Sequence, residues 1–250
     1  MPKVDILGVQ VDVVDKEGLQ KTLLESVRHR RKNVFAYVNV HAINLALKDG
    51  GFREFLNKAE RVYCDGEGVR LAASMVGTRL PPRIVLTYWI WDLCELCEQE
   101  GLSMFFLGGR QETVGLAVKN IRTRFGGLKI AGFHHGYFEK SGQESDKVIE
   151  TINQAAPDIL FVGFGMPMQE HWIGQNVNRI HAHAILPSGS MIEYTAGTKS
   201  FAPAWMAENG LEWVHRLFQE PGRLWKRYVL GNPAFFILVL MQLITRGRQR

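Results

Sequence analysis

Short apolar runs alternate with longer segments of helical spacing over most of this chain of 250 residues. Runs rich in β-branched and aromatic residues predict strands at residues 34–40, 61–64, 104–107, 130–133, 159–162 and 184–186. Helical patterns lie between them, notably at residues 112–125, 145–155 and 167–179. This alternation predicts an α/β fold with a mostly parallel sheet and flanking helices.

The two ends of the chain follow different patterns. The first fifteen residues mix acidic with apolar positions, which indicates a strand and not a secretory signal. After Pro203 the strand pattern stops, and Pro221 and Pro233 suit helix starts. We therefore expect a boundary within residues 197–203, between an α/β core (1–200) and a helical appendage (201–250).

The appendage carries the most apolar segment of the chain. Residues 234–244, interrupted only by Gln242, are about half of the roughly 20 residues that a spanning helix requires. The segment should lie on a bilayer, or alternatively pack in a core or an oligomer interface.

Basic residues are concentrated in the last forty positions: Arg216, Arg223, Lys226, Arg227, Arg246, Arg248 and Arg250. This end should attract anions, and we expect an anionic membrane surface as partner and not nucleic acid.

The cysteines and histidines argue against a metal or disulfide framework. Three cysteines in a chain of this length suggest a reducing, cytoplasmic compartment. Cys94 and Cys97 fall inside a helical pattern, so we expect them on a helix face. The histidine pairs 134/135 and 181/183 lack further ligands at suitable spacing, and no Asp-x-Asp clamp is present. We expect no metal and no cofactor.

Asp65 follows a predicted strand, and Gly66 opens the helix after it. In open α/β sheets, ligands bind beyond the carboxyl ends of the strands. Asp65 is either the N-cap of that helix or a general base that takes a proton from an attacking hydroxyl.

Glycine-bearing loops follow two other predicted strands. After residue 162 come Gly163, Gly165, Pro167, Gln169 and Glu170, and after residue 107 come Gly108 and Gly109. Glycines allow close approach of a ligand, and backbone N–H groups at a helix start suit a diphosphate. Gln169 and Glu170 could contact sugar hydroxyls or only stabilise the turn. Together the loops predict one crevice for a nucleotide diphosphate.

The order of these motifs resembles the WecG/TagA/CpsF glycosyltransferase family over nearly the whole chain. The segments that carry the resemblance are Asp65-Gly66 with Gly68, residues 107–109, His135-Gly136-Tyr137-Phe138, residues 163–170 with Trp172, Ala196-Gly197, Ala202-Pro203, Trp205, residues 210–213, Arg216-Leu217, Glu220-Pro221, Arg223 and Arg227-Tyr228. The chain differs from the family pattern at Glu193, Phe201 and residues 87–89, which leaves the donor sugar open.

The resemblance implies a Rossmann-like core and a metal-independent, inverting transfer. The donor would be a UDP-sugar and the acceptor a polyprenyl-diphosphate-linked sugar, in the synthesis of a cell-surface polysaccharide or teichoic acid. Asp65 would be the catalytic base, with Asn39 and Gln169 in the pocket. The appendage would close over the donor diphosphate with Arg216, Arg223 or Arg227, and the enzyme would sit peripherally on the inner face of the cell membrane.

Two other functions would fit part of the sequence. A nucleotide-sugar oxidoreductase or epimerase would use a similar sheet, but the incomplete glycine fingerprint counts against it. A non-catalytic membrane-surface module would explain the tail and leave the glycine-bearing strand ends unexplained.

Overall fold

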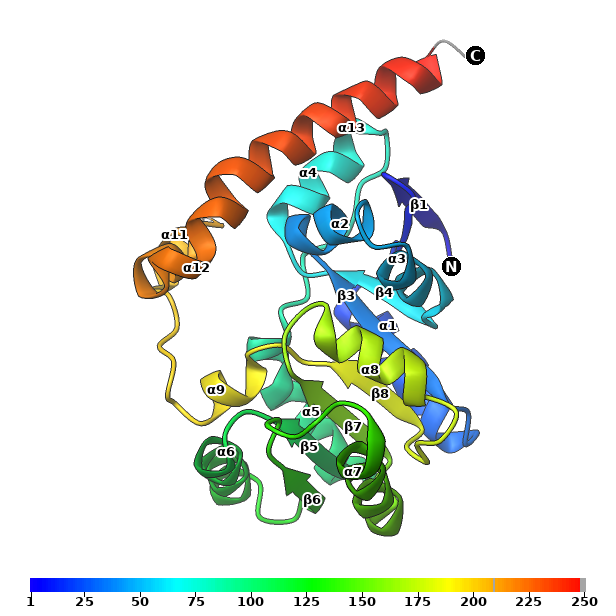
Figure 1. Ribbon diagram of the computed structural model, residues 1–250, viewed down its shortest axis with the longest axis vertical. Helices are drawn as coiled ribbons and strands as arrows, with labels where there is room; N and C mark the ends of the chain where they lie inside the picture. The colour runs from blue at the N-terminus through cyan, green and yellow to red at the C-terminus, as the bar shows by residue number, and fades with distance from the viewer. Residues whose placement is uncertain (209, 248–250) are drawn as a thin grey trace.

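A parallel sheet forms the centre of the protein (Figure 1). The computed structural model describes residues 1–208 and 210–247, without the side chains of residues 207, 208, 223, 246 and 247. Within that part the main sheet has six strands in the order β4-β3-β8-β7-β5-β6, and every neighbouring pair is parallel. The strands are β3 (Asn33–Val38), β4 (Arg61–Cys64), β5 (Ser103–Gly108), β6 (Lys129–His134), β7 (Ile159–Gly163) and β8 (Ala184–Pro187). The predicted strands and the α/β class are confirmed.

Helices cover both faces of this sheet. On one face lie α1 (Lys16–Arg28), α5 (Leu86–Glu100), α6 (Gln111–Arg124) and α9 (Met191–Thr195). On the other lie α2 (Val40–Ala46), α3 (Gly50–Lys58), α4 (Glu67–Met75), α7 (Gly142–Ala155) and α8 (Met168–Asn176). Strand side chains alternate between the two cores: Phe106 joins the first, and Phe105 and Leu107 join the second. A parallel sheet is buried on both faces, which explains its nearly continuous apolar strands.

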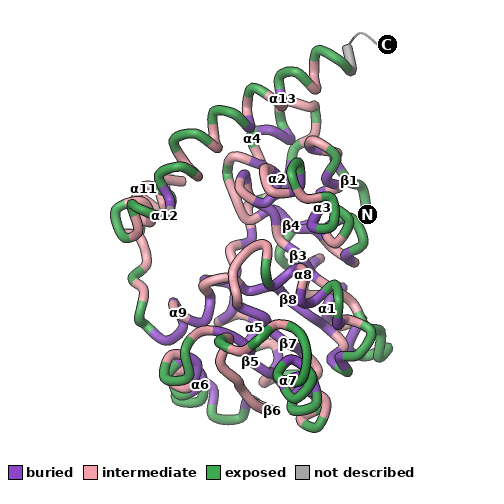
Figure 2. Tube along the Cα trace, in the orientation of Figure 1, coloured by how far each residue is buried: buried purple, intermediate pink, exposed green. Residues whose placement is uncertain are grey.

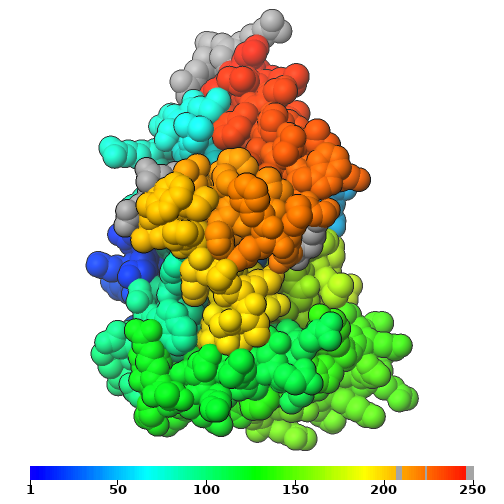
Figure 3. Space-filling view, turned by 90° about the vertical axis from the view of Figure 1, so that its left-hand side faces the viewer, coloured from blue at the N-terminus to red at the C-terminus, as the bar shows by residue number. Residues whose placement is uncertain are grey.

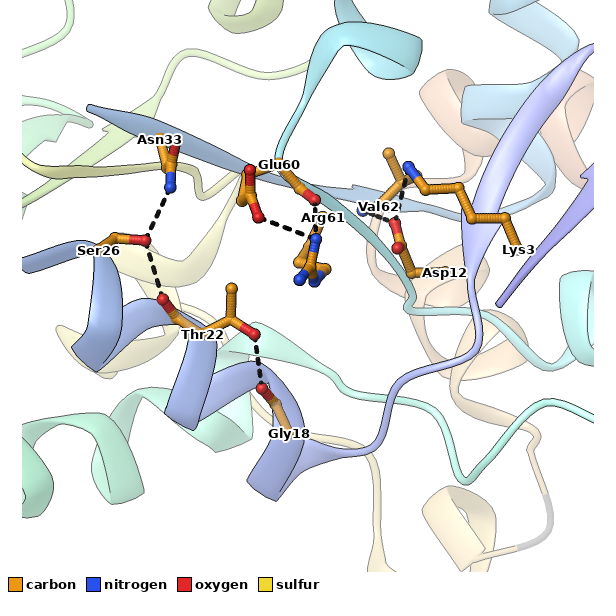
Figure 4. A network of polar contacts seen from close by, with 9 residues as sticks. All are labelled: Lys3, Asp12, Gly18, Thr22, Ser26, Asn33, Glu60, Arg61 and Val62. Atoms are coloured by element: carbon orange, nitrogen blue, oxygen red, sulfur yellow. Dashed lines mark hydrogen bonds and ion pairs between the residues drawn. The ribbon is translucent and has the colours of Figure 1, made fainter. Parts of the chain in front are cut away.

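The amino terminus forms a separate antiparallel hairpin of β1 (Lys3–Ile6) and β2 (Val9–Asp12). The hairpin packs beside β4, the edge strand of the main sheet. Asp12 Oδ2 accepts a hydrogen bond of 2.8 Å from the backbone N–H of Val62, and Lys3 Nζ lies 3.5 Å from the same carboxylate (Figure 4). The hairpin therefore occupies a hydrogen-bonding group that an edge strand would otherwise expose.

The chain after α9 is irregular over residues 196–203 and then helical. The helices are α10 (Ala204–Glu208), α11 (Glu212–Gln219), α12 (Pro221–Trp225), the π-helical turn η1 (Lys226–Leu230) and α13 (Gly231–Gly247). Pro221 is the first residue of α12, as predicted. The predicted helix start at Pro233 is wrong, because Pro233 lies inside a helical run that continues from residue 221 to 247. A proline ring clashes with the carbonyl four residues earlier, and the wider π turn directly before it loosens the ladder there. A division into domains at residue 200 stays a prediction.

Helix α13 lies along α2 and α4 (Figure 1), so the appendage packs on the core. Phe235 and Val239 are fully buried in the core that these helices share. Gln242 faces the same way: its Nε2 donates to Asp5 Oδ1 at 2.8 Å, and its Oε1 accepts from Leu7 N at 3.1 Å. The opposite side of α13 is exposed and apolar, with Ile237, Leu240, Met241 and Ile244 (Figure 2). The segment thus has a protein-facing side and an exposed apolar side.

The expectation that the apolar segment is too short to cross a bilayer needs correction. Helix Lys226–Thr245 has 20 residues and is long and apolar enough to span a membrane, and little of it is buried. The apolar run covers only residues 234–244, whereas the helix begins eight residues earlier, at Lys226. Length and composition alone do not establish a span, and Phe235 and Val239 show that part of this helix covers core. Arg248 and Arg250, and the side chain of Arg246, lie outside the described residues.

Candidate active site

A cavity of about 340 Å³ opens at the carboxyl ends of β3, β4, β7 and β8. Its lining includes Asn39 after β3, Asp65 after β4, Gly165 after β7 and Gly189 after β8. The chain runs from β3 to its neighbour β4 and then crosses to the other half of the sheet, so the cavity lies where the connections change direction. This is the position at which open α/β sheets bind ligands.

Further cavities adjoin this one on either side. A cavity of about 270 Å³ shares Asn39, Asp65, Arg216 and Arg227 with it and reaches Gly66. Another, of about 660 Å³, is lined by Gly109, Gly163 and Gly165 and by the loop after β6. The structure thus brings the three loops picked out from the sequence to one edge of the sheet.

Asp65 stands at the centre of this arrangement. Its backbone N–H extends the ladder by donating to Val38 O at 2.9 Å. The alternative that Asp65 caps the next helix is wrong, because the N-cap of α4 is Gly66 and no side chain caps it. Burial raises the pKa of the Asp65 carboxyl above its ordinary value, while Arg216, the hydrogen bond from Asn39 and Arg83 act in the opposite direction. The carboxylate is therefore more basic than a solvated aspartate.

Asn39 links the catalytic candidate to the carboxy-terminal helices. Its Oδ1 caps α2 by accepting from Ala42 N at 3.1 Å, and it also accepts from Arg227 Nη2 at 3.3 Å. Because Oδ1 is turned to these donors, Nδ2 faces Asp65 Oδ2, 3.4 Å away. The side chain thus orients the Asp65 carboxylate and contacts a cation of the appendage at the same time.

The appendage supplies two cations of the site, in addition to Arg83 and Lys199 of the core. Arg216 of α11 and Arg227 of η1 line both cavities beside Asp65, and the Arg216 guanidinium lies 5.4 Å from the centre of the Tyr194 ring. The side chain of Arg223, the third predicted arginine, lies outside the described residues. Figure 3 shows this segment, in yellow and orange, lying across the face of the molecule between α13 and the lower half of the core. The site is complete only with the appendage in place.

Gln169 and Glu170 do not line any of these cavities. Both side chains are buried beneath the loops, at 0% and 1% exposure. Gln169 Oε1 accepts from the backbone N–H groups of Gly165 and Gly189, and Gln169 Nε2 donates to Glu170 Oε1. The N–H of Gln169 donates to Gly165 O, so two of the N–H groups predicted to bind a diphosphate are already paired. Pro167 is the N-cap residue of α8. The helix therefore begins at Met168, one position after the start predicted from the sequence.

At two of the predicted glycines, a side chain would collide with a neighbouring segment, each for a different reason. A Cβ on Gly108, whose φ is +152°, would lie 2.4 Å from Gly163 O, because these two residues are paired at the ends of β5 and β7. A Cβ on Gly66 would lie 3.0 Å from Asn39 Cβ. Gly66 therefore keeps α4 close to the loop that carries Asn39.

Several residues of the site were not found from the sequence: Tyr37, Arg83, Ser188, Gly189, Ser190, Glu212 and Tyr228. The segment 188–190 follows a predicted strand and could have been found by the same rule as Asp65. Arg83 gives no local signal. It pairs with Glu212 of α11 and lies 3.4 Å from Glu67 Oε1, which only the packing of α11 on the core brings together.

The cysteine prediction is confirmed, since Cys94 and Cys97 are free and buried on α5. Among residues 1–208 and 210–247, no group of three or more His, Cys, Asp or Glu side chains could hold a metal ion. Of the histidine pair considered from the sequence, His134 is the last residue of β6 and His135 follows it. His135 Nδ1 accepts a hydrogen bond from Tyr137 N at 3.2 Å.

Comparisons with known proteins show the family of this chain. A sequence profile of the glycosyl transferase WecG/TagA/CpsF family matches residues 4–249, so the chain belongs to that family. A protein of Staphylococcus aureus (strain MW2), named N-acetylglucosaminyldiphosphoundecaprenol N-acetyl-beta-D-mannosaminyltransferase, is 29% identical over 227 residues, which cover 90% of this chain and 86% of the relative. A relative of the same name from Staphylococcus aureus (strain MRSA252) is 28% identical over the same share of each chain.

Proposed function

We propose that this glycosyltransferase of the WecG/TagA/CpsF family transfers N-acetylmannosamine from a UDP donor to a diphosphoundecaprenyl-linked N-acetylglucosamine. Membership of the family supports glycosyl transfer over the oxidoreductase and the non-catalytic module. The sugar and the acceptor follow from the name of the similar Staphylococcus aureus proteins. UDP is proposed as the nucleotide of the donor because the sequence motifs resemble those of the WecG/TagA/CpsF family.

The observation that carries the proposal is the environment of Asp65. A carboxylate of raised pKa lies at a strand end, borders two adjoining cavities and is oriented by Asn39. A general base needs this combination of access, orientation and basicity. Donor and acceptor can then occupy different cavities and meet at the carboxylate.

In the proposed reaction Asp65 takes the proton from an acceptor hydroxyl, and the hydroxyl oxygen forms a bond to the anomeric carbon of the donor. The bond from that carbon to the UDP oxygen breaks on the opposite face, so an α-linked donor gives a β-linked product. The electron pair leaves with the diphosphate. Arg216 and Arg227, which line the cavity, would stabilise that charge, because guanidinium groups pair well with phosphate oxygens. We propose that no metal ion is required for this stabilisation.

The acceptor side is assigned to the cavity of about 270 Å³. Asn232 and Phe236 of α13 line it together with Asp65, and the exposed apolar side of the same helix carries Ile237 and Leu240. A helix that inserts this side into the acyl boundary would place the cavity beside a lipid-linked diphosphate. The enzyme would then act peripherally on the inner face of the cell membrane.

The test is transfer of labelled N-acetylmannosamine from UDP to a diphospholipid-linked N-acetylglucosamine by wild type and Asp65→Asn. We expect Asp65→Asn to lower kcat by a factor of about 100 or more with little change in UDP affinity. Asp158, whose Oδ2 accepts from Ser103 at the amino end of β5, offers a matched carboxylate outside the cavities, and Asp158→Asn should retain the chemical step. Near-normal turnover of Asp65→Asn would refute the assignment of the base.

A further inference from the structure

Gln169 joins the loop after β7 to the loop after β8. Its Oε1 accepts from Gly165 N at 3.1 Å, in the loop after β7, and from Gly189 N at 3.0 Å, in the loop after β8. One buried amide therefore connects the ends of β7 and β8.

The chemistry of the donors fixes the orientation of this amide. Backbone N–H groups can only donate, so the side-chain oxygen of Gln169 must face Gly165 and Gly189, and the nitrogen must face away. Glu170 Oε1 lies on that other side and accepts from Gln169 Nε2 at 2.8 Å. Glu170 thus holds the orientation in which Gln169 can bind both loops.

The two loops form a wall of the candidate site. Gly165 and Gly189 both line the cavity that contains Asp65 and the cavity on its far side. Both have left-handed backbones, with φ of +83° and +53°, and a Cβ on Gly189 would lie 2.7 Å from the Tyr37 hydroxyl. Small movements of either loop would change the shape of both cavities.

We propose that Gln169 and Glu170 are a positioning pair that sets the separation of the Gly165 and Gly189 loops, and that neither side chain touches substrate. The observations behind this role are the burial of both side chains and their absence from the linings of the three site cavities. It replaces the direct sugar contact expected from the sequence. The choice of UDP as a probe rests on the proposed function, but the positioning role does not.

The decisive variant exchanges the two residues, as Q169E/E170Q. The carboxylate at position 169 would accept from Gly165 and Gly189, and the amide at position 170 would donate to it, so each of the three hydrogen bonds of the Gln169 side chain has a counterpart. Gln169→Leu has a similar size and removes the connection. Gln175 is exposed on the same helix, and Gln175→Leu is the matched control.

Two measurements are made on each full-length variant: amide hydrogen exchange at Gly165 and Gly189, and the Kd of UDP by calorimetry. We expect Gln169→Leu to speed exchange at both glycines by roughly tenfold, as for loss of one hydrogen bond of about 1.4 kcal/mol, and to weaken UDP binding. The exchanged double variant should restore both values to within a few-fold of wild type, and Gln175→Leu should change neither.

Three results would overturn the positioning role. These are unchanged exchange in Gln169→Leu, a double variant that regains protection without regaining UDP affinity, and a double variant that does not fold. The second would show that the Gln169 amide touches the ligand. If wild type does not bind UDP, the proposed donor is refuted, and the exchange measurements still decide whether the pair positions the loops.

Discussion

Replacing Glu170 by Gln tests how much stability the fold gives up to bury this carboxyl. Burial raises the pKa of Glu170 from 4.5 to about 7, and the hydrogen bond from Gln169 opposes the shift. Its Oε2 has no hydrogen-bond partner among the described residues, so the ionised form lacks full compensation. The neutral glutamine has nearly the same shape and cannot ionise.

The direction in which the free energy of unfolding changes with pH follows from proton binding by the native and the unfolded protein. Between pH 4.5 and about 7 the native protein keeps a proton on Glu170 that the unfolded chain has lost. The free energy of unfolding therefore falls as the pH rises through this window, and the loss is complete above it. A shift of this size corresponds to about 3 kcal/mol at most, because one pKa unit is about 1.4 kcal/mol.

Glu170→Gln removes this pH-dependent loss. It also places an amide N–H₂ where Oε2 lacks a partner, which costs about 1–3 kcal/mol at every pH. The net effect at one pH is therefore less informative than its change with pH. Relative to wild type, the variant should gain up to about 3 kcal/mol between about pH 4 and about pH 8.

Urea unfolding of both proteins, followed by tryptophan fluorescence at the two pH values, measures this change. The acid measurement is the control, since both proteins are neutral at position 170 there. A stability difference that is the same at both pH values would refute the buried, proton-retaining Glu170 on which the calculation depends.

Four further predictions concern the site and the appendage. Arg216→Gln should move the acid limb of the kcat/KM profile to higher pH, because Arg216 lowers the pKa of Asp65; an unmoved limb would contradict the coupling. Transfer should persist after metal removal with a chelator, and a strict need for added divalent metal would overturn the proposed leaving-group chemistry. Leu240→Glu with Ile244→Glu, on the exposed side of α13, should reduce binding to anionic vesicles without unfolding. By contrast, Phe235→Ala on the buried side should lower stability by about 3–5 kcal/mol in urea unfolding.

The amino-acid sequence by itself determined the main sheet, its class and the location of its ligand edge. Buried parallel strands such as β4 and β7 are short apolar runs bounded by turn residues, so their pattern is local and readable. Asp65 and Gly165 follow such strands directly, and this local order is enough to place them at one edge.

Only the tertiary structure decided which contacts those edge residues make. The sequence could not show that the Gln169 side chain is buried and hydrogen-bonded beneath the loops, because one of its partners, Gly189 N, is twenty residues away. Likewise Arg227 reaches Asn39 across 188 positions, and α13 acquires a buried and an exposed side only by packing on α2 and α4. Local propensity and periodicity specify elements, whereas contacts between distant segments depend on how the whole chain packs.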